Sequence, residues 1–120
     1  MGETSGTPPL AFKILTDEQR TVLLTEEIFS GAPVDLADGY IHLSSATQVA
    51  ETLDKHFSGQ TGLHIAAVDL ATLGNTVRWE ESRGGQLFPH IYGPLPLSSI
   101  GVMIPVERTE DGSVILPPLP

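Results

Sequence analysis

The feature that most constrains the fold is a set of short segments in which polar and apolar residues alternate. They run through residues 40–44, 77–80 and 90–92. Successive side chains of a strand point to opposite faces, so these segments predict short strands of a sheet with one apolar and one polar face. The apolar face packs on a core, and the polar face either meets solvent or lines a site.

Helix signals lie early in the chain. Thr16 and Gln19 form a capping-box pattern that predicts a helix over about residues 17–26. Ser45 and Gln48 repeat the pattern. The helix expected after them carries three apolar residues on one stripe: Val49, Leu53 and Phe57.

The remaining strand signals lie mostly later. Apolar runs predict strands over residues 12–15, 63–68, 101–106 and 114–116, the last returning beside its predecessor through a turn at Asp111-Gly112. The order β-α-β-α-β-β-β-β predicts an α+β fold of mixed or mostly antiparallel strands with two N-terminal helices. We expect a flexible tail over 1–10, one domain over 11–116 and a Pro-rich tail over 117–120.

Composition excludes several classes of site and partner. The 120 residues include no cysteine, which excludes disulfides, thiolate metal sites and a cysteine nucleophile. Six basic residues against fifteen acidic ones give a net charge of −9, which disfavours general nucleic-acid binding and anionic membranes. No segment has the length and apolarity of a membrane span or a signal peptide, so we expect a cytoplasmic protein. The oligomeric state is left open.

The alternating segments supply the candidate site residues. His42 and His90 stand in the aromatic, glycine- and proline-rich contexts Gly-Tyr-Ile-His-Leu-Ser and Phe-Pro-His-Ile-Tyr-Gly-Pro, whereas a solvated strand face usually carries Lys, Glu and Thr. Glu80 follows Trp79, which would desolvate the carboxylate and favour its neutral form; the alternative is an exposed Arg78–Glu80 pair. The predicted polar faces together comprise Tyr40, His42, Ser44, Arg78, Glu80, His90 and Tyr92.

These motifs resemble a family of small bacterial proteins known as domain of unknown function 952. The stretches that carry the resemblance are Phe12–Thr16, Asp38–Ser44, Val77–Glu80 and Leu87–Leu95. The resemblance implies an ADP-ribosyltransferase-like fold, built from two small sheets around a nicotinamide-dinucleotide cleft. It is nearest to the RNA 2′-phosphotransferases, which also carry a His-Leu-Ser on a core strand. It implies that His42 contacts a ribose hydroxyl or phosphate of an NAD or ADP-ribose derivative, with Ser44 beside it.

The chain also departs from the phosphotransferase pattern. No arginine precedes His42 at the place where those phosphotransferases need one, and the late catalytic glutamate has no secure counterpart. Two hypotheses therefore stand side by side. One is a transferase-like enzyme on a small nucleotide, with catalytic residues His42, Glu80 and His90 and ligand-binding residues Tyr40, Ser44, Arg78 and Tyr92. The other is a binding module that kept the cleft without the chemistry.

A third hypothesis is a metal-dependent enzyme. His42, His90 and Glu80 supply the two histidines and one carboxylate that such a site uses. Nothing in their spacing requires a metal, so we expect none to be bound.

Overall fold

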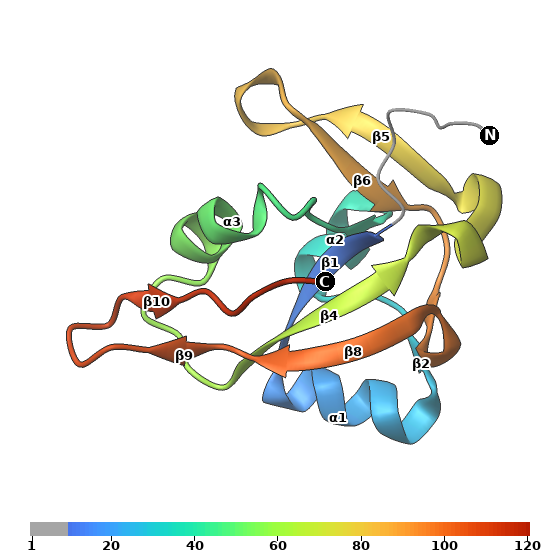
Figure 1. Cartoon of the computed structure of the whole chain (residues 1–120). Helices are drawn as coiled ribbons and strands as arrows, with labels where there is room; N and C mark the ends of the chain where they lie inside the picture. Colours follow the sequence, from blue (N-terminus) through green and yellow to red (C-terminus); the bar gives the residue numbers. More distant parts are fainter. Residues whose placement is uncertain (1–9) are drawn as a thin grey trace.

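The computed structural model of this chain describes residues 10–120 (Figure 1). The three α-helices are α1 (Asp17–Glu26), α2 (Pro33–Asp38) and α3 (Val49–His56). The longer strands are β1 (Leu10–Thr16), β4 (Leu63–Asp69), β5 (Val77–Glu81), β6 (Leu87–Ile91) and β8 (Ile100–Pro105). The short strands are β2 (Ile28–Phe29), β3 (Ile41–His42), β7 (Leu95–Pro96), β9 (Glu107–Arg108) and β10 (Val114–Ile115). Short 3-10 turns cover Leu70–Thr76, Arg83–Gly85 and Leu97–Ser99.

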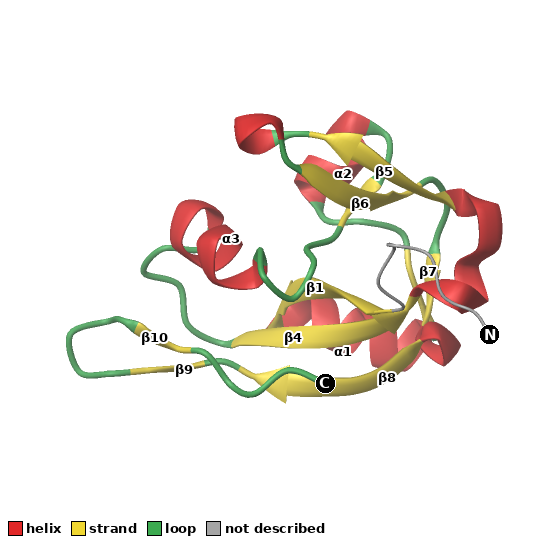
Figure 2. Ribbon diagram, turned by 45° about the horizontal axis from the view of Figure 1, so that its top comes forward, coloured by secondary structure: helices red, strands yellow, loops and turns green. Residues whose placement is uncertain are grey.

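The architecture is α+β, with antiparallel pairing throughout the described sheets. We call the sheet β1–β4–β8 the main sheet and the sheet β3–β6–β5 the small sheet. Figure 1 shows the β5–β6 pair above the main sheet and α1 below it, while Figure 2 shows α2 close to the small sheet. No helix within residues 10–120 is both long and apolar enough to cross a membrane.

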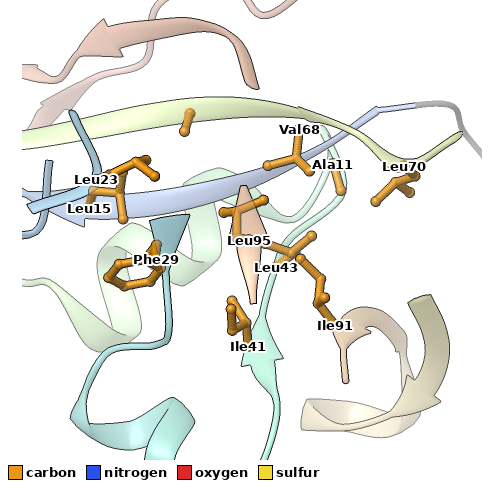
Figure 3. Packing of buried hydrophobic residues seen from close by; sticks show 11 residues of the cluster. Ala11, Leu15, Leu23, Phe29, Ile41, Leu43, Val68, Leu70, Ile91 and Leu95 are labelled. Atoms are coloured by element: carbon orange, nitrogen blue, oxygen red, sulfur yellow. The ribbon is translucent and has the colours of Figure 1, made fainter. Parts of the chain in front are cut away.

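The main sheet is apolar on both faces. On one face, Ala11 and Leu15 of β1 and Val68 of β4 pack with Leu23 of α1 (Figure 3). The same cluster continues into the small sheet through its buried residues: Ile41, Leu43 and Ile91. The opposite face packs under α3 in a second cluster of buried residues: Phe12, Ile14, Val49, Leu53, Leu63, Ile65 and Ala67. The first cluster thus fixes the small sheet against the main one.

The predicted first helix is confirmed together with its cap. Thr16 Oγ1 accepts the Gln19 N–H at 3.1 Å, and Gln19 Oε1 accepts the Thr16 N–H at 3.0 Å. The helix α3 begins at Val49, later than its capping pattern suggested. Only half of the expected capping box forms: Gln48 Oε1 accepts the Ser45 N–H, but the Ser45 side chain does not accept the Gln48 N–H. Its apolar stripe is confirmed, with Val49 and Leu53 fully buried.

Several sequence predictions need correction. Residues 10–120 hold a third α-helix besides the two expected ones: α2 begins at Pro33, because proline is pre-set for a first helical turn. The strand over 114–116 pairs with β9 and not with β8. Only Ile41–His42 of the segment 40–44 forms a regular strand, while Ser44 makes a single bridge with Phe12 of β1.

The chain ends also differ from expectation. Leu10 already belongs to β1, opposite Asp69, whereas residues 1–9 of the expected tail lie outside the described residues. The Pro-rich end forms no helix or strand, as predicted from its prolines, but Leu119 packs against the second cluster.

Candidate functional site

The predicted polar residues gather on one face of the small sheet. His42 is the cross-strand partner of His90, and His90 is also the partner of Arg78. Side chains two residues apart on a strand share a face. The register therefore brings three further residues to this face: Tyr40, Glu80 and Tyr92.

The rings on this face contact one another. Tyr40 stacks on His90 with centroids 4.2 Å apart and lies 4.8 Å from His42 and 5.2 Å from Tyr92. The two histidine rings meet edge to face at 5.3 Å. The Arg78 guanidinium lies over the Tyr92 ring at 4.9 Å, a cation–π contact on the rim of the group. The two histidines are therefore close enough to contact the same small group.

His42 lies between two carboxylates of α2. Its Nδ1 is 2.6 Å from Asp35 Oδ1, and its Nε2 is 3.0 Å from Asp38 Oδ2. The contact of Nδ1 with Asp35 is a hydrogen bond, and the contact of Nε2 with Asp38 is at ion-pair distance, which applies when the ring is protonated. The turn at Gly39, in the left-handed region at φ 90°, brings α2 and β3 into this arrangement.

Asp35 is the centre of a buried polar network. It is 1% exposed and accepts bonds from Lys13 Nζ at 2.8 Å, the Ala32 N–H at 2.8 Å and the His42 N–H at 3.0 Å. Burial raises the pKa of Asp35, but the His42 hydrogen bond and the Lys13 charge outweigh it and bring that pKa to about 2. Lys13, also buried, donates to the His42 carbonyl at 3.0 Å. The site is thus tied to the main sheet through β1.

His90 has a carboxylate partner of its own. Its Nδ1 lies 2.7 Å from Glu80 Oε1, which also accepts the Tyr92 hydroxyl at 2.7 Å. These bonds, the one from His90 first, lower the pKa of Glu80, and the bond to Glu80 raises the pKa of Tyr92. Of the two alternatives for Glu80, desolvation by Trp79 that favours the neutral form gains no support, because two donors stabilise the carboxylate and Arg78 also lowers its pKa. Glu80 is ionised at neutral pH and orients His90.

The other nitrogen of His90 is without a partner among the described residues. The side chain is buried, 2% exposed, and its Nε2 makes no hydrogen bond. Because Glu80 accepts from Nδ1, that nitrogen carries a proton, which leaves Nε2 free to accept or, when protonated, to donate. Leaving such a buried atom unsatisfied costs about 1–3 kcal/mol.

A cavity of about 590 Å³ adjoins both histidines. Its wall includes His42, His90, Asp38 and Ser44. The Ser44 hydroxyl shares a 2.9 Å hydrogen bond with Thr52 of α3, which closes that side. Three phenylalanines supply apolar wall: Phe12, Phe57 and Phe88. The other predicted site residues, Tyr40, Arg78, Glu80 and Tyr92, do not line this cavity.

The metal hypothesis gains no geometric support. Across residues 10–120, no three or more His, Asp or Glu side chains are grouped as metal ligands would be. The Glu80 carboxylate that such a site would use is engaged by His90 and Tyr92.

The sequence of the chain matches a known protein family. Residues 14–103 match the family described as "Protein of unknown function (DUF952)". The chain belongs to this family. No curated protein matches the chain. The DUF952 match runs from the end of β1 through most of β8, and therefore covers both histidine pairs.

Solved structures agree with the family assignment. The chain is 40% identical to protein CC0527 from Caulobacter crescentus, whose crystal structure superposes with a TM-score of 0.84 over 88% of this chain and 93% of that one. The solution NMR structure of CC0527 gives 41% identity, a TM-score of 0.78 and coverage of 89% and 91%. None of these matches concerns an ADP-ribosyltransferase, so that resemblance stays a prediction.

Sequence reasoning missed three residues of the site. Lys13 lies within an apolar strand, and Asp35 and Asp38 lie in a segment taken for a loop. A usable signal was present for Asp35, since an acidic residue two positions after a proline suits the first turn of a helix. The Lys13 contact depends on tertiary packing and carries no local signal.

Proposed function

We propose that the cavity beside His42 and His90 binds a small nucleotide of the NAD or ADP-ribose type, on which the protein acts as a transferase-like enzyme. The observation that carries the proposal is the buried, unpartnered Nε2 of His90, on a residue that lines the cavity. Small-ligand sites span about 300–1,000 Å³, and this cavity of about 590 Å³ falls within that range. A ligand group bonded to Nε2 would remove the cost of the unsatisfied atom.

His90 is the proton-transfer group in this proposal, and Glu80 is its positioning residue. Glu80 holds the Nδ1 proton and the ring orientation, so Nε2 is left to exchange a proton with the ligand. The Tyr40 ring stacked on His90 limits rotation of the imidazole. Histidine is suited to the task because its ordinary pKa lies close to neutral pH.

The nucleotide class is supported by the remaining wall. His42 and Ser44 belong to the His-Leu-Ser motif that, in the resembling phosphotransferases, contacts ribose or phosphate, and both residues line the cavity. Phe12, Phe57 and Phe88 offer apolar surface for a base. The net charge of −9 favours one small ligand over a nucleic-acid chain.

A binding module without turnover is the second candidate. It is favoured by the surroundings of His42, whose two nitrogens both lie beside a carboxylate and not beside open cavity. In that case the same cavity binds the nucleotide, but no product forms.

The experiment compares thermal unfolding of the wild type, His90→Gln and His64→Gln with NAD, ADP-ribose and AMP. His64 is the matched control, because it pairs with a carboxylate, Asp17, at 2.6 Å but does not line the cavity. A ligand at a hundred times its Kd adds about 2.7 kcal/mol to the free energy of unfolding, which raises Tm by roughly 10 °C in a domain of this size.

We expect an ADP-ribose compound to raise the Tm of the wild type and of His64→Gln but not of His90→Gln. Equal stabilisation of all three proteins would place the ligand elsewhere, and no stabilisation by any compound would contradict the proposal. Turnover of the stabilising compound, lost in His90→Gln, would select the enzyme over the binding module.

A further inference from the structure

The two carboxylates that face His42 are held very differently. Asp35 is 1% exposed and accepts from Lys13 and two main-chain N–H groups as well as from the His42 ring. The Asp38 side chain is 45% exposed, and within the described residues its contact is with His42 alone. Asp38 can therefore leave His42 without breaking any other bond, whereas Asp35 cannot.

The position of Asp38 at the end of α2 also weakens its interaction with His42. It is the last residue of the helix, where the partial negative charge of the carbonyl ends disfavours a carboxylate. The ion pair with His42 is partly exposed, so it contributes at most about 1 kcal/mol. Asp38 lines the cavity as well, so the site that it would vacate is open to a ligand.

The charges around His42 favour an anion once Asp38 has left. When His42 is protonated, it and Lys13 supply two positive charges, and Asp35 supplies one negative charge. In that state the group without Asp38 carries a net charge of +1. One anionic group restores neutrality, and the unpartnered Nε2 of His90 lies on a ring only 5.3 Å from that of His42.

We propose that Asp38 stands in for an anionic ligand group at Nε2 of His42 in the free protein, and that a phosphate group of the nucleotide displaces it on binding. The phosphate oxygen accepts the Nε2 hydrogen bond of His42, a second oxygen or hydroxyl bonds His90 Nε2, and the Asp38 carboxylate turns to solvent. No covalent bond changes. The inference rests on the proposed function and adds to it the ligand's phosphate group and a competing contact that weakens its binding.

The test measures dissociation constants of AMP, inorganic phosphate and adenosine by calorimetry for the wild type, Asp38→Asn and Asp17→Asn. Both variants remove one negative charge and one carboxylate–histidine pair, but Asp17 pairs with His64 away from the cavity. Asp38→Asn is expected to tighten AMP and phosphate about fivefold, which corresponds to about 1 kcal/mol. Adenosine affinity stays unchanged, as do all affinities in Asp17→Asn. His42→Gln added to Asp38→Asn removes the gain.

The outcomes separate this inference from the proposed function. If ADP-ribose stabilises the wild type but Asp38→Asn does not tighten AMP or phosphate, the inference is overturned and the proposed function stands. If Asp38→Asn tightens inorganic phosphate while no nucleotide binds, the inference holds and the proposed function fails. An equal gain in Asp17→Asn would reduce the effect to net charge and overturn the inference, as would an absence of phosphate binding in every variant.

Discussion

The main sheet and the small sheet differ in strand length, in burial and in the polar residues that they carry. The main sheet has seven-residue strands, β1 and β4, whose side chains are buried on both faces. The small sheet has shorter strands: β3 spans only two residues, and β5 is half-buried or exposed along its length. One of its faces packs on the first cluster, and the other carries the two carboxylate-paired histidines, of which His90 is also buried. The comparison teaches that the histidines stand on the small sheet, whereas the main sheet supplies most of the core and, through Phe12 and Ile14, part of the cavity wall.

A buried ion pair adds to the apolar contacts that hold the two sheets together. Lys13 projects from β1 of the main sheet and reaches Asp35, which in turn holds His42 of the small sheet. A buried ion pair seldom adds net stability relative to apolar residues, but it fixes geometry when every polar atom is satisfied. We infer that this pair sets where His42 stands relative to the cavity.

The largest effect is expected from breaking this junction. Asp35→Ala leaves the Lys13 ammonium buried without its counter-charge, which is expected to lower the free energy of unfolding by about 3–5 kcal/mol. Urea unfolding followed by the fluorescence of Trp79, the single tryptophan, measures the loss. Asp54→Ala, an exposed carboxylate on α3, is the control and should change stability by less than about 0.5 kcal/mol. Similar values for both variants would refute the role of the junction.

A substitution that leaves a void in the core of the main sheet tests whether stability and ligand binding can be changed separately. Ile65 of β4 is fully buried in the second cluster, so Ile65→Ala is expected to cost about 2–5 kcal/mol of unfolding free energy. The affinity for ADP-ribose, measured well below the lowered Tm, should remain within about twofold of the wild type. His90→Gln should show the reverse pattern. A large loss of binding in Ile65→Ala would mean that the two sheets are not separable in this way.

Acid is expected to weaken the junction in a defined pH range. The folded-state pKa of Asp35 is about 2 against an ordinary value of 3.8. A lowered folded-state pKa stabilises the fold above the unfolded value, and this contribution, about 2 kcal/mol, is lost as pH falls from about 4 to about 2. Unfolding free energies of the wild type and Asp35→Asn at several pH values measure it. The gap between the two proteins should narrow with acid; a constant gap would contradict the assigned pKa.

The smallest effect is expected at the other carboxylate of α2. Asp38→Asn loses a partly exposed ion pair but also removes a negative charge from a helix C-terminus, so stability should change by less than about 0.5 kcal/mol. Chemical denaturation beside Asp35→Ala tests the contrast. A loss as large as that of Asp35→Ala would show that both carboxylates are structural.

Local signals predicted much of the fold. The Thr16–Gln19 capping box and the alternation of residues 77–80 and 90–92 depend on neighbours in sequence, and the structure confirms the elements they predicted. The helix α2 was missed because it is short and follows a glycine and an alanine that resemble a loop. Residues 114–116 were predicted to pair with the strand over residues 101–106, but they pair with β9, the two-residue strand that follows it. The sequence of the turn does not show that the chain forms a separate short strand before it.

The site was predicted in part for the same reason. Alternation placed His42, His90 and Tyr92 on the polar face, and the register of the small sheet brings them together. Lys13, Asp35 and Asp38 escaped prediction because their contacts span different elements: the Lys13–Asp35 bond joins residues 22 positions apart. Which carboxylate faces which histidine is a property of packing and has no local sequence signature.

The central claim is that a nucleotide binds beside His42 and His90, and NMR of the histidine rings tests it most directly. The chain has four histidines, so each ring can be assigned and followed through a titration with ADP-ribose. The account predicts that the ring nitrogen and carbon signals of His42 and His90 shift together, with one dissociation constant, while those of His64 stay in place. Unmoved signals from His42 and His90 at saturating ADP-ribose, NAD and AMP would contradict it.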